Sequence, residues 1–204
     1  MKRILCTLSL ALLTGATGAA ELEPPGYPAV LLNTEPTLAT PPAPRLALGN
    51  LGITLERTRL GDIARATGAP ITREREGDSV RDWICFSTTE GGRALRVWLM
   101  SAEPDGVITE AQIEPAASDR RCPRLPLEMM PVRIANGLHP SQSRADVIKA
   151  AGQPSRAEDG WLMYMADRPL AAADGKTHHE LNILAVKLVG GRVTRVLATQ
   201  STSP

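Results

Sequence analysis

Apolar and polar residues alternate along two groups of segments, and glycine-containing turns separate the segments within each group. The first group comprises residues 80–87, 95–101 and 107–113, and the second comprises residues 161–166, 180–189 and 193–198. Period-two alternation rich in Trp, Ile and Val is typical of β-strands. Each group therefore predicts a three-stranded antiparallel sheet, because short turns join strands that run in opposite directions.

A helical period appears ahead of the first group of strands. Residues 58–67 carry Leu60, Ile63 and Ala64 on one face, which predicts an amphipathic helix. Gly68 supplies the left-handed conformation that ends a helix, and Pro70 prevents its continuation. A helix of about ten residues is marginal alone in water, so we expect it to be docked on the sheet.

The same pattern recurs 84 positions later, since residues 62–70 read DIARATGAP and residues 146–154 read DVIKAAGQP. Ser143 and Asp146 resemble a capping box at the start of the second helix. This recurrence predicts a duplication. The expected units are a first repeat at 46–114, an inter-repeat linker at 115–136 that contains Cys122, a second repeat at 137–200 and a tail at 201–204.

The expected fold class is α+β, with two tandem repeats. Each repeat would pack one or two short helices on one face of a three- to four-stranded antiparallel sheet, although 46–57 and 135–142 are equally compatible with a helix, a strand or neither. Such a sheet leaves its other face to water or to a partner.

Strand parity indicates which side chains would lie on that open face. Alternation places three residues opposite the apolar row of Leu95, Val97 and Leu99, and two polar residues on the following strand share their face. The predicted protein-binding residues are Arg96, Trp98, Met100, Glu110 and Gln112. Trp and Arg dominate the energetics of many interfaces. The alternative is that Trp98 covers the sheet or packs against the other repeat.

The N-terminus has the pattern of a secretory signal peptide over residues 1–20. Lys2 and Arg3 precede an apolar run, and small residues lead to a predicted cleavage site near Ala20. The apolar run is too short to span a bilayer, so no transmembrane segment is expected and the mature protein is predicted to be periplasmic or secreted. A lipid anchor is not expected, because Cys6 stands at the beginning of the run.

Residues 21–45 contain seven prolines and few large apolar side chains. Proline fixes φ and lacks the amide hydrogen, so this segment is predicted to be an extended, flexible linker. A tether or a peptide ligand for a groove are the alternative interpretations.

Charge and cysteine content narrow the functional classes. Loss of Lys2 and Arg3 with the leader reduces the 23 basic residues to 21 against 22 acidic ones, which argues against nucleic acid as a partner. The two remaining cysteines, Cys85 and Cys122, predict one disulfide in an oxidising compartment. A redox-active or metal-binding pair is disfavoured by their wide spacing.

The order of a helix, Gly-x-Pro, an aromatic strand and two further strands, with the DGWLMY sequence at 159–164, resembles a known family. It is similar to the small lipoproteins of the bacterial outer-membrane assembly machinery, and in tandem it resembles the β-lactamase inhibitor protein fold. The resemblance covers about residues 46–200 and implies helical hairpins on antiparallel sheets that bind other proteins. The chain departs from the family at 138–141 and in the missing lipid-carrying cysteine.

The residue inventory contains no phosphate loop, nucleophile elbow or paired carboxylates. The single metal-competent cluster, His178, His179 and Glu180 with Asp174 nearby, is not expected to bind metal because neighbouring strand residues point to opposite faces. His139 is interpreted as a loop residue.

The predicted function is a non-enzymatic, cofactor-free protein-binding module of the cell envelope. The alternatives are a small-ligand carrier that uses the concavity between the two sheets, or, less favoured, a metal-dependent enzyme.

Overall fold

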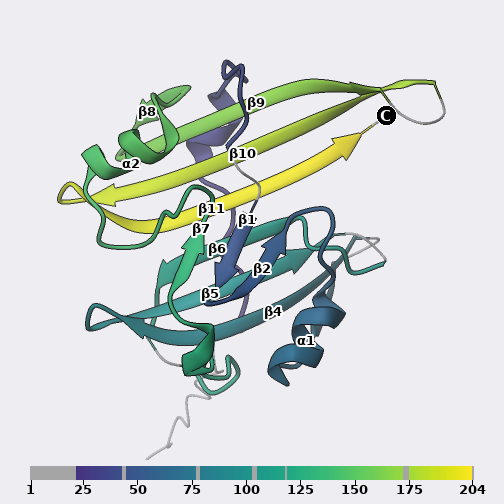
Figure 1. Ribbon diagram of the computed structural model, residues 1–204, viewed down its shortest axis with the longest axis vertical. Helices are drawn as coiled ribbons and strands as arrows, with labels where there is room; N and C mark the ends of the chain where they lie inside the picture. Colours follow the sequence, from purple (N-terminus) through teal and green to yellow (C-terminus); the bar gives the residue numbers. More distant parts are fainter. Residues whose placement is uncertain are drawn as a thin grey trace, which may run out of the picture.

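A computed structural model describes residues 22–42, 45–76, 79–102, 105–117, 119–171 and 175–203. Its largest element is an eight-stranded antiparallel sheet (Figure 1). In spatial order this sheet contains β3 (Thr72–Glu76), β4 (Ser79–Glu90), β5 (Arg93–Ser101), β6 (Glu110–Pro115), β11 (Arg192–Ser203), β10 (Thr177–Val189), β9 (Trp161–Ala171) and β8 (Arg156–Glu158). The predicted leader and Asp174 lie outside the described residues.

The two predicted groups of strands join edge to edge. Strand β6 pairs with β11 in the register Val196↔Ile113 and Ala198↔Ala111, so the groups share one hydrogen-bonded sheet. Along the chain, a helix followed by four strands of this sheet occurs twice. Each group also has one more strand than the sequence pattern indicated, the outer strands β3 and β8.

A second, three-stranded sheet has the order β2-β1-β7. It is formed by β1 (Arg45–Leu48), β2 (Leu51–Thr54) and β7 (Val132–Ile134). Gly49 turns β1 into β2 with a φ of 57°, and a Cβ atom at this position would collide with the backbone carbonyl of Glu128. The predicted inter-repeat linker 115–136 supplies strand β7, and residues 201–203 of the predicted tail are the last residues of β11.

Both predicted helices are present, and their ends follow the sequence signals. Helix α1 (Leu60–Thr67) ends at Gly68, which is left-handed with a φ of 73°. Helix α2 (Arg144–Ala151) begins with the Ser143–Asp146 capping box, in which both reciprocal hydrogen bonds are formed. Two short 3-10 helices, η1 (Ala29–Asn33) and η2 (Leu127–Met129), complete the helical content of the described residues. None of these helices is long and apolar enough to cross a bilayer.

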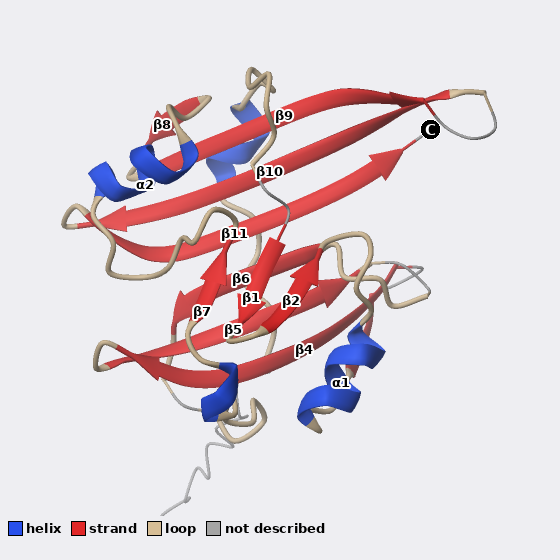
Figure 2. Ribbon diagram, viewed as in Figure 1, coloured by secondary structure: helices blue, strands red, loops and turns tan. Residues whose placement is uncertain are grey.

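The main hydrophobic core lies between the front face of the eight-stranded sheet and the layer formed by the small sheet and both helices (Figure 2). The large sheet contributes alternating side chains such as Val97 and Leu99, and the opposing layer contributes Leu48, Ile63 and Val147. All of these side chains are almost completely excluded from solvent. Burial of this apolar surface is the principal stabilising term, at about 25 cal/mol per Å².

The expected fold class is wrong. The structure is 50% strand and 14% helix, with one eight-stranded and one three-stranded sheet, rather than two repeats that each pack helices on a sheet of their own. The physical reason is that two helices of eight residues each cannot cover so wide a face. The three-stranded sheet covers its middle instead, and α1 lies over β4 and β5 beside it.

The back face of the large sheet is covered by residues 22–38, which we call the N-terminal strap. Leu22 is buried in one apolar cluster on this face, and Val30 is buried in another. Residues 22–42 therefore do not form the flexible linker predicted from their prolines. The alternative interpretation, a peptide ligand, is closer to what is observed, because the segment packs on a sheet face of its own chain.

The predicted disulfide is confirmed, with an S–S distance of 2.00 Å between Cys85 and Cys122. It attaches the loop after β6 to the back of β4. The same loop is held by main-chain hydrogen bonds, because Ser87 donates to Pro123 and accepts from Leu125. The disulfide and the strap thus cover adjacent parts of one face, since Leu22 packs in the same cluster as both cysteines.

Replacing both Cys85 and Cys122 with alanine is expected to lower the free energy of unfolding by about 3 to 4 kcal/mol. The cysteines are separated by 37 residues, and the bridge removes loop-closure entropy from the unfolded chain. Equilibrium urea denaturation of the variant checks this value, with the reduced wild-type protein as a control that should behave in the same way. A decrease below about 1 kcal/mol would contradict the expectation.

Candidate functional site

Strand parity correctly grouped the predicted binding residues on one face. Trp98 pairs with Gln112 and Met100 pairs with Glu110 in the β5–β6 register, so these four side chains share the back of the sheet. That face is not open. Trp98 and Gln112 are 0% exposed and Met100 is 3% exposed. The predicted open binding surface is therefore wrong, and Arg96 and Glu110 are only partly accessible.

Trp98 is a core residue of the back face. Its ring contacts Trp83 in a T-shaped arrangement with 5.2 Å between centroids, and its Nε1 donates to Glu114 at 2.9 Å. Arg96 covers the outer side of the ring, with 5.4 Å from its guanidinium carbon to the ring centroid. The alternative considered for Trp98, that it covers the sheet, describes this arrangement.

Gln112 and Glu110 bind the strap. The Gln112 Nε2 donates to the carbonyl of Pro25 at 3.0 Å, and the hydroxyl of Tyr27 donates to Glu110 at 2.5 Å. Arg195 on β11 donates to the Gly26 carbonyl at 2.7 Å and to Gln112 Oε1 at 2.5 Å. Two successive main-chain carbonyls of the strap are thus held by side chains from the two strands that join the halves of the sheet.

Burial governs the electrostatics of this network. Burial raises the pKa of Glu110 above its usual range and lowers the pKa of Arg195, and it also raises the pKa of Tyr27. Each shift favours the neutral form of the group. The hydrogen bonds that Glu110 accepts from Tyr27 and Gln112 partly offset the rise in its pKa, and the charges of Glu114 and Glu110 partly offset the fall in the pKa of Arg195. Arg195 also lies over the ring of Trp161, 5.6 Å from the centroid, which fixes its position between sheet and strap.

Arg195, which binds the strap, could not be recognised as a contact residue from the sequence. Strict alternation would put Val193, Arg195 and Leu197 on one face of β11. The β10–β11 pairing shifts register between Lys187 and Leu188, and Val193 and Leu197 lie in opposite cores. Nothing in the sequence marks this irregularity apart from the nearby Gly190-Gly191 turn.

The second half of the strap crosses strands β9–β11. Val30 packs against a methionine-containing cluster, and the Asn33 carbonyl accepts from Arg156 at 2.9 Å. At the edge of β9, the Leu38 amide donates to the Met165 carbonyl at 3.1 Å. Leu38 then packs against the front core, so the chain passes around this edge before β1 begins.

The histidine cluster predicted near the start of β10 is divided between the faces of the sheet. His179 Nδ1 lies 3.1 Å from Asp167, whereas Glu180 is buried and accepts from Arg168 at 2.7 Å. Within the described ranges, no group of three or more His, Cys, Asp or Glu side chains is placed to hold a metal ion.

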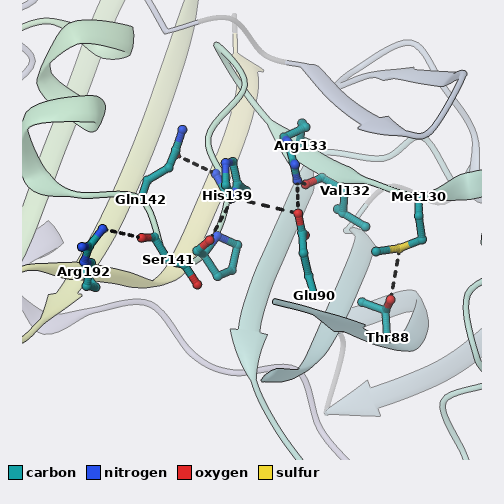
Figure 3. Close-up of polar contacts among 10 residues, drawn as sticks. Thr88, Glu90, Met130, Val132, Arg133, His139, Ser141, Gln142 and Arg192 are labelled. Carbon is teal, nitrogen blue, oxygen red and sulfur yellow. Dashed lines mark hydrogen bonds and ion pairs between the residues drawn. The ribbon is translucent and has the colours of Figure 1, made fainter. Parts of the chain in front are cut away.

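His139 lies beside a polar contact between Glu90, at the end of β4, and Arg133 on β7 (Figure 3). Glu90 accepts from Arg133 at 2.5 Å and lies 4.0 Å from the His139 ring. The Nδ1 of His139 is 2.8 Å from the Pro140 carbonyl. The Glu90–Arg133 hydrogen bond joins β4 of the large sheet to β7 of the small one, and the His139 ring lies beside it.

Comparison of the chain with protein-family models, curated proteins and solved structures gave no match. The resemblance to the outer-membrane assembly lipoproteins and to the β-lactamase inhibitor protein fold therefore stays a prediction.

Replacing Trp98 with alanine is expected to lower the free energy of unfolding by about 3 to 5 kcal/mol, because a fully buried indole leaves a cavity that its surroundings cannot fill. Urea denaturation measures the loss. Arg93→Ala, at an exposed position of the same strand, is the control and should change stability by no more than about 0.5 kcal/mol. Equal stability of the two variants would contradict the buried position of Trp98.

The contribution of Glu110 to stability should depend on pH in a defined direction. Its pKa is raised in the folded state, so the folded protein takes up this proton at a higher pH than the unfolded chain does. The stability of the wild type relative to Glu110→Gln should therefore increase as the pH falls from 7 toward the ordinary glutamate pKa of about 4.3. Urea denaturation of both proteins at pH 7 and pH 5 tests the sign, and a constant or reversed difference would refute it.

Proposed function

We propose that the protein is a non-enzymatic protein-binding module whose back sheet face recognises an extended, proline-containing peptide. The observation that carries the proposal is the set of hydrogen bonds between the sheet and the strap. Gln112 and Arg195 hold the carbonyls of Pro25 and Gly26, and Tyr27 reaches Glu110 from the same segment. A partner peptide would occupy this place after the strap has left it.

The chemistry of the face suits such a ligand. Proline restricts the free chain, so a proline-containing segment loses little entropy when it binds in an extended form. Contacts to main-chain carbonyls depend on backbone shape and not on side-chain identity. Leu22 and Val30 are buried and act as two apolar anchors, one on each side of the hydrogen-bonded residues 25–27. A segment of another protein with the same spacing of apolar anchors would accept hydrogen bonds from the same donors, Gln112 and Arg195.

The strap competes with any partner because it belongs to the same chain. A tethered segment acts at an effective concentration in the millimolar range, so a partner needs tighter contacts or a loosened strap. We further propose that the protein works outside the cytoplasm, at the cell envelope. The disulfide supports this location, since oxidising compartments preserve such bridges.

Strap exchange tests the proposal. A protease recognition sequence inserted after the exposed Thr40 allows the folded protein to be cut, which leaves the strap bound without a covalent link. A fluorescent peptide of residues 22–40 should then replace it, as measured by anisotropy. In the Arg195→Ala variant the peptide should bind about 10- to 100-fold more weakly, because a charge-assisted hydrogen bond to Gly26 is lost.

The matched control is a peptide with Leu32 replaced by alanine, which should bind as well as the original because Leu32 is 88% exposed. A scrambled peptide with the same prolines should not compete. If the cut strap fails to exchange until the protein unfolds, or if the scrambled peptide competes equally, the strap is a fixed part of the fold and the proposal fails.

A further inference from the structure

A polar cleft of about 410 Å³ lies between the two sheets, on the front side and away from the strap. One wall comes from β1, β2 and the loop after β2, and the other comes from the far ends of β9, β10 and β11. The lining residues are Arg45, Thr54, Leu55, Glu56, Arg57, Arg168, Leu170, Glu180, Gln200 and Thr202. This volume falls within the range of about 300 to 1,000 Å³ that is typical of small-molecule sites.

The floor of the cleft is built around Glu180, which is 6% exposed. Its carboxylate accepts from Arg168 Nε at 2.7 Å, from Asn182 Nδ2 at 2.7 Å and from Gln200 Nε2 at 2.9 Å. The hydrogen bond from Arg168 is the main reason that the pKa of Glu180 is lowered. Glu180 is therefore ionised at neutral pH and already has three donors.

This arrangement fixes the orientation of both amides. Because the NH2 groups of Asn182 and Gln200 point at a carboxylate, their carbonyl oxygens point away from it. Asn182 and Gln200 are directly opposite each other in the β10–β11 register. Both carbonyl oxygens are buried and neither accepts a hydrogen bond. Gln200 lines the cleft but is only 7% exposed, so its Oε1 is an unpaired acceptor enclosed beneath the cleft surface.

The rim of the cleft carries positively charged donors that have no acceptor in the described part of the chain. The carboxylate of Glu56 is occupied, because the amide and the hydroxyl of Thr202 each donate to it at 2.6 Å. Arg45 and Arg57 are exposed, and within the described part of the chain their side chains form no hydrogen bond or ion pair. Both acidic groups of the cleft are thus satisfied by the protein, while two guanidinium groups remain free for an anion.

We infer that this cleft binds a small oxyanion, a phosphate or a carboxylate, that also carries a hydroxyl or N–H donor. The anionic group lies at Arg45 and Arg57, and the donor pairs with the Oε1 of Gln200, which is enclosed in the unliganded protein and becomes accessible when this side chain turns toward the cleft. The ligand fills the unmet acceptor on the floor and the unmet positive charge on the rim with one molecule. This site goes beyond the peptide-binding function proposed above, because it lies on the opposite face of the large sheet and shares no residue with the strap.

Four probes separate the parts of this chemistry on the full-length protein. Glucose 6-phosphate and gluconate combine an anion with hydroxyl donors and distinguish a phosphate from a carboxylate ligand. Glucose offers donors alone, and sulfate offers charge alone. At least one hydroxylated anion should raise the melting temperature and give a saturable heat in isothermal titration. Glucose and sulfate should bind at least 10-fold more weakly than that anion.

Two variants locate the site. The double substitution Arg45→Gln with Arg57→Gln alters exposed side chains and should leave the unliganded melting temperature within a few degrees, while weakening the anion at least 10-fold. Arg93→Gln, an exposed arginine outside the cleft, is the matched control and should bind as the wild type does. The inference is overturned if neither hydroxylated anion binds, if glucose or sulfate binds equally well, or if the double variant retains full affinity.

Discussion

The structure depends on the pairing of β6 with β11, which turns two groups of strands into one eight-stranded sheet. A sheet of this width with apolar side chains on both faces has to be covered on both sides, because an exposed apolar face would favour association with other chains. On the front, the small sheet and the two helices provide the cover. On the back, the strap and the disulfide-linked loop provide it.

Local features of the fold could be predicted from the sequence, whereas the features that combine distant segments could not. Gly68, the Ser143–Asp146 box and the Cys85–Cys122 pair act over short distances or have few alternatives. The β6–β11 pairing joins segments about 85 residues apart, and no sequence period encodes it. Strands as short as β7 carry too few residues for alternation to be recognised, so the second sheet and the mostly β class were missed.

The same distinction explains the outcome for the candidate site. Parity placed Trp98 and Gln112 on the correct face, because side-chain direction in a strand is a local property. Whether that face is open depends on a segment more than 60 residues away, whose prolines indicated flexibility and whose anchors are single residues such as Leu22 and Val30. A small-ligand site between two sheets was one of the alternatives from the sequence, but its residues could not be predicted, because Arg57 and Gln200 meet only through tertiary folding.

The strap and the cleft lie on opposite faces, yet one stretch of chain runs from the first toward the second. The strap reaches the edge of β9 at Leu38 and leads to β1, whose first residue, Arg45, lines the cleft. Strand β1 is hydrogen-bonded on both sides, to β2 and to β7. Departure of the strap would therefore break the Leu38–Met165 contact before it could disturb β1. Because the pairing of β1 with β2 and β7 holds the rim of the cleft independently of the strap, we expect little energetic coupling between the proposed peptide site and the proposed cleft site.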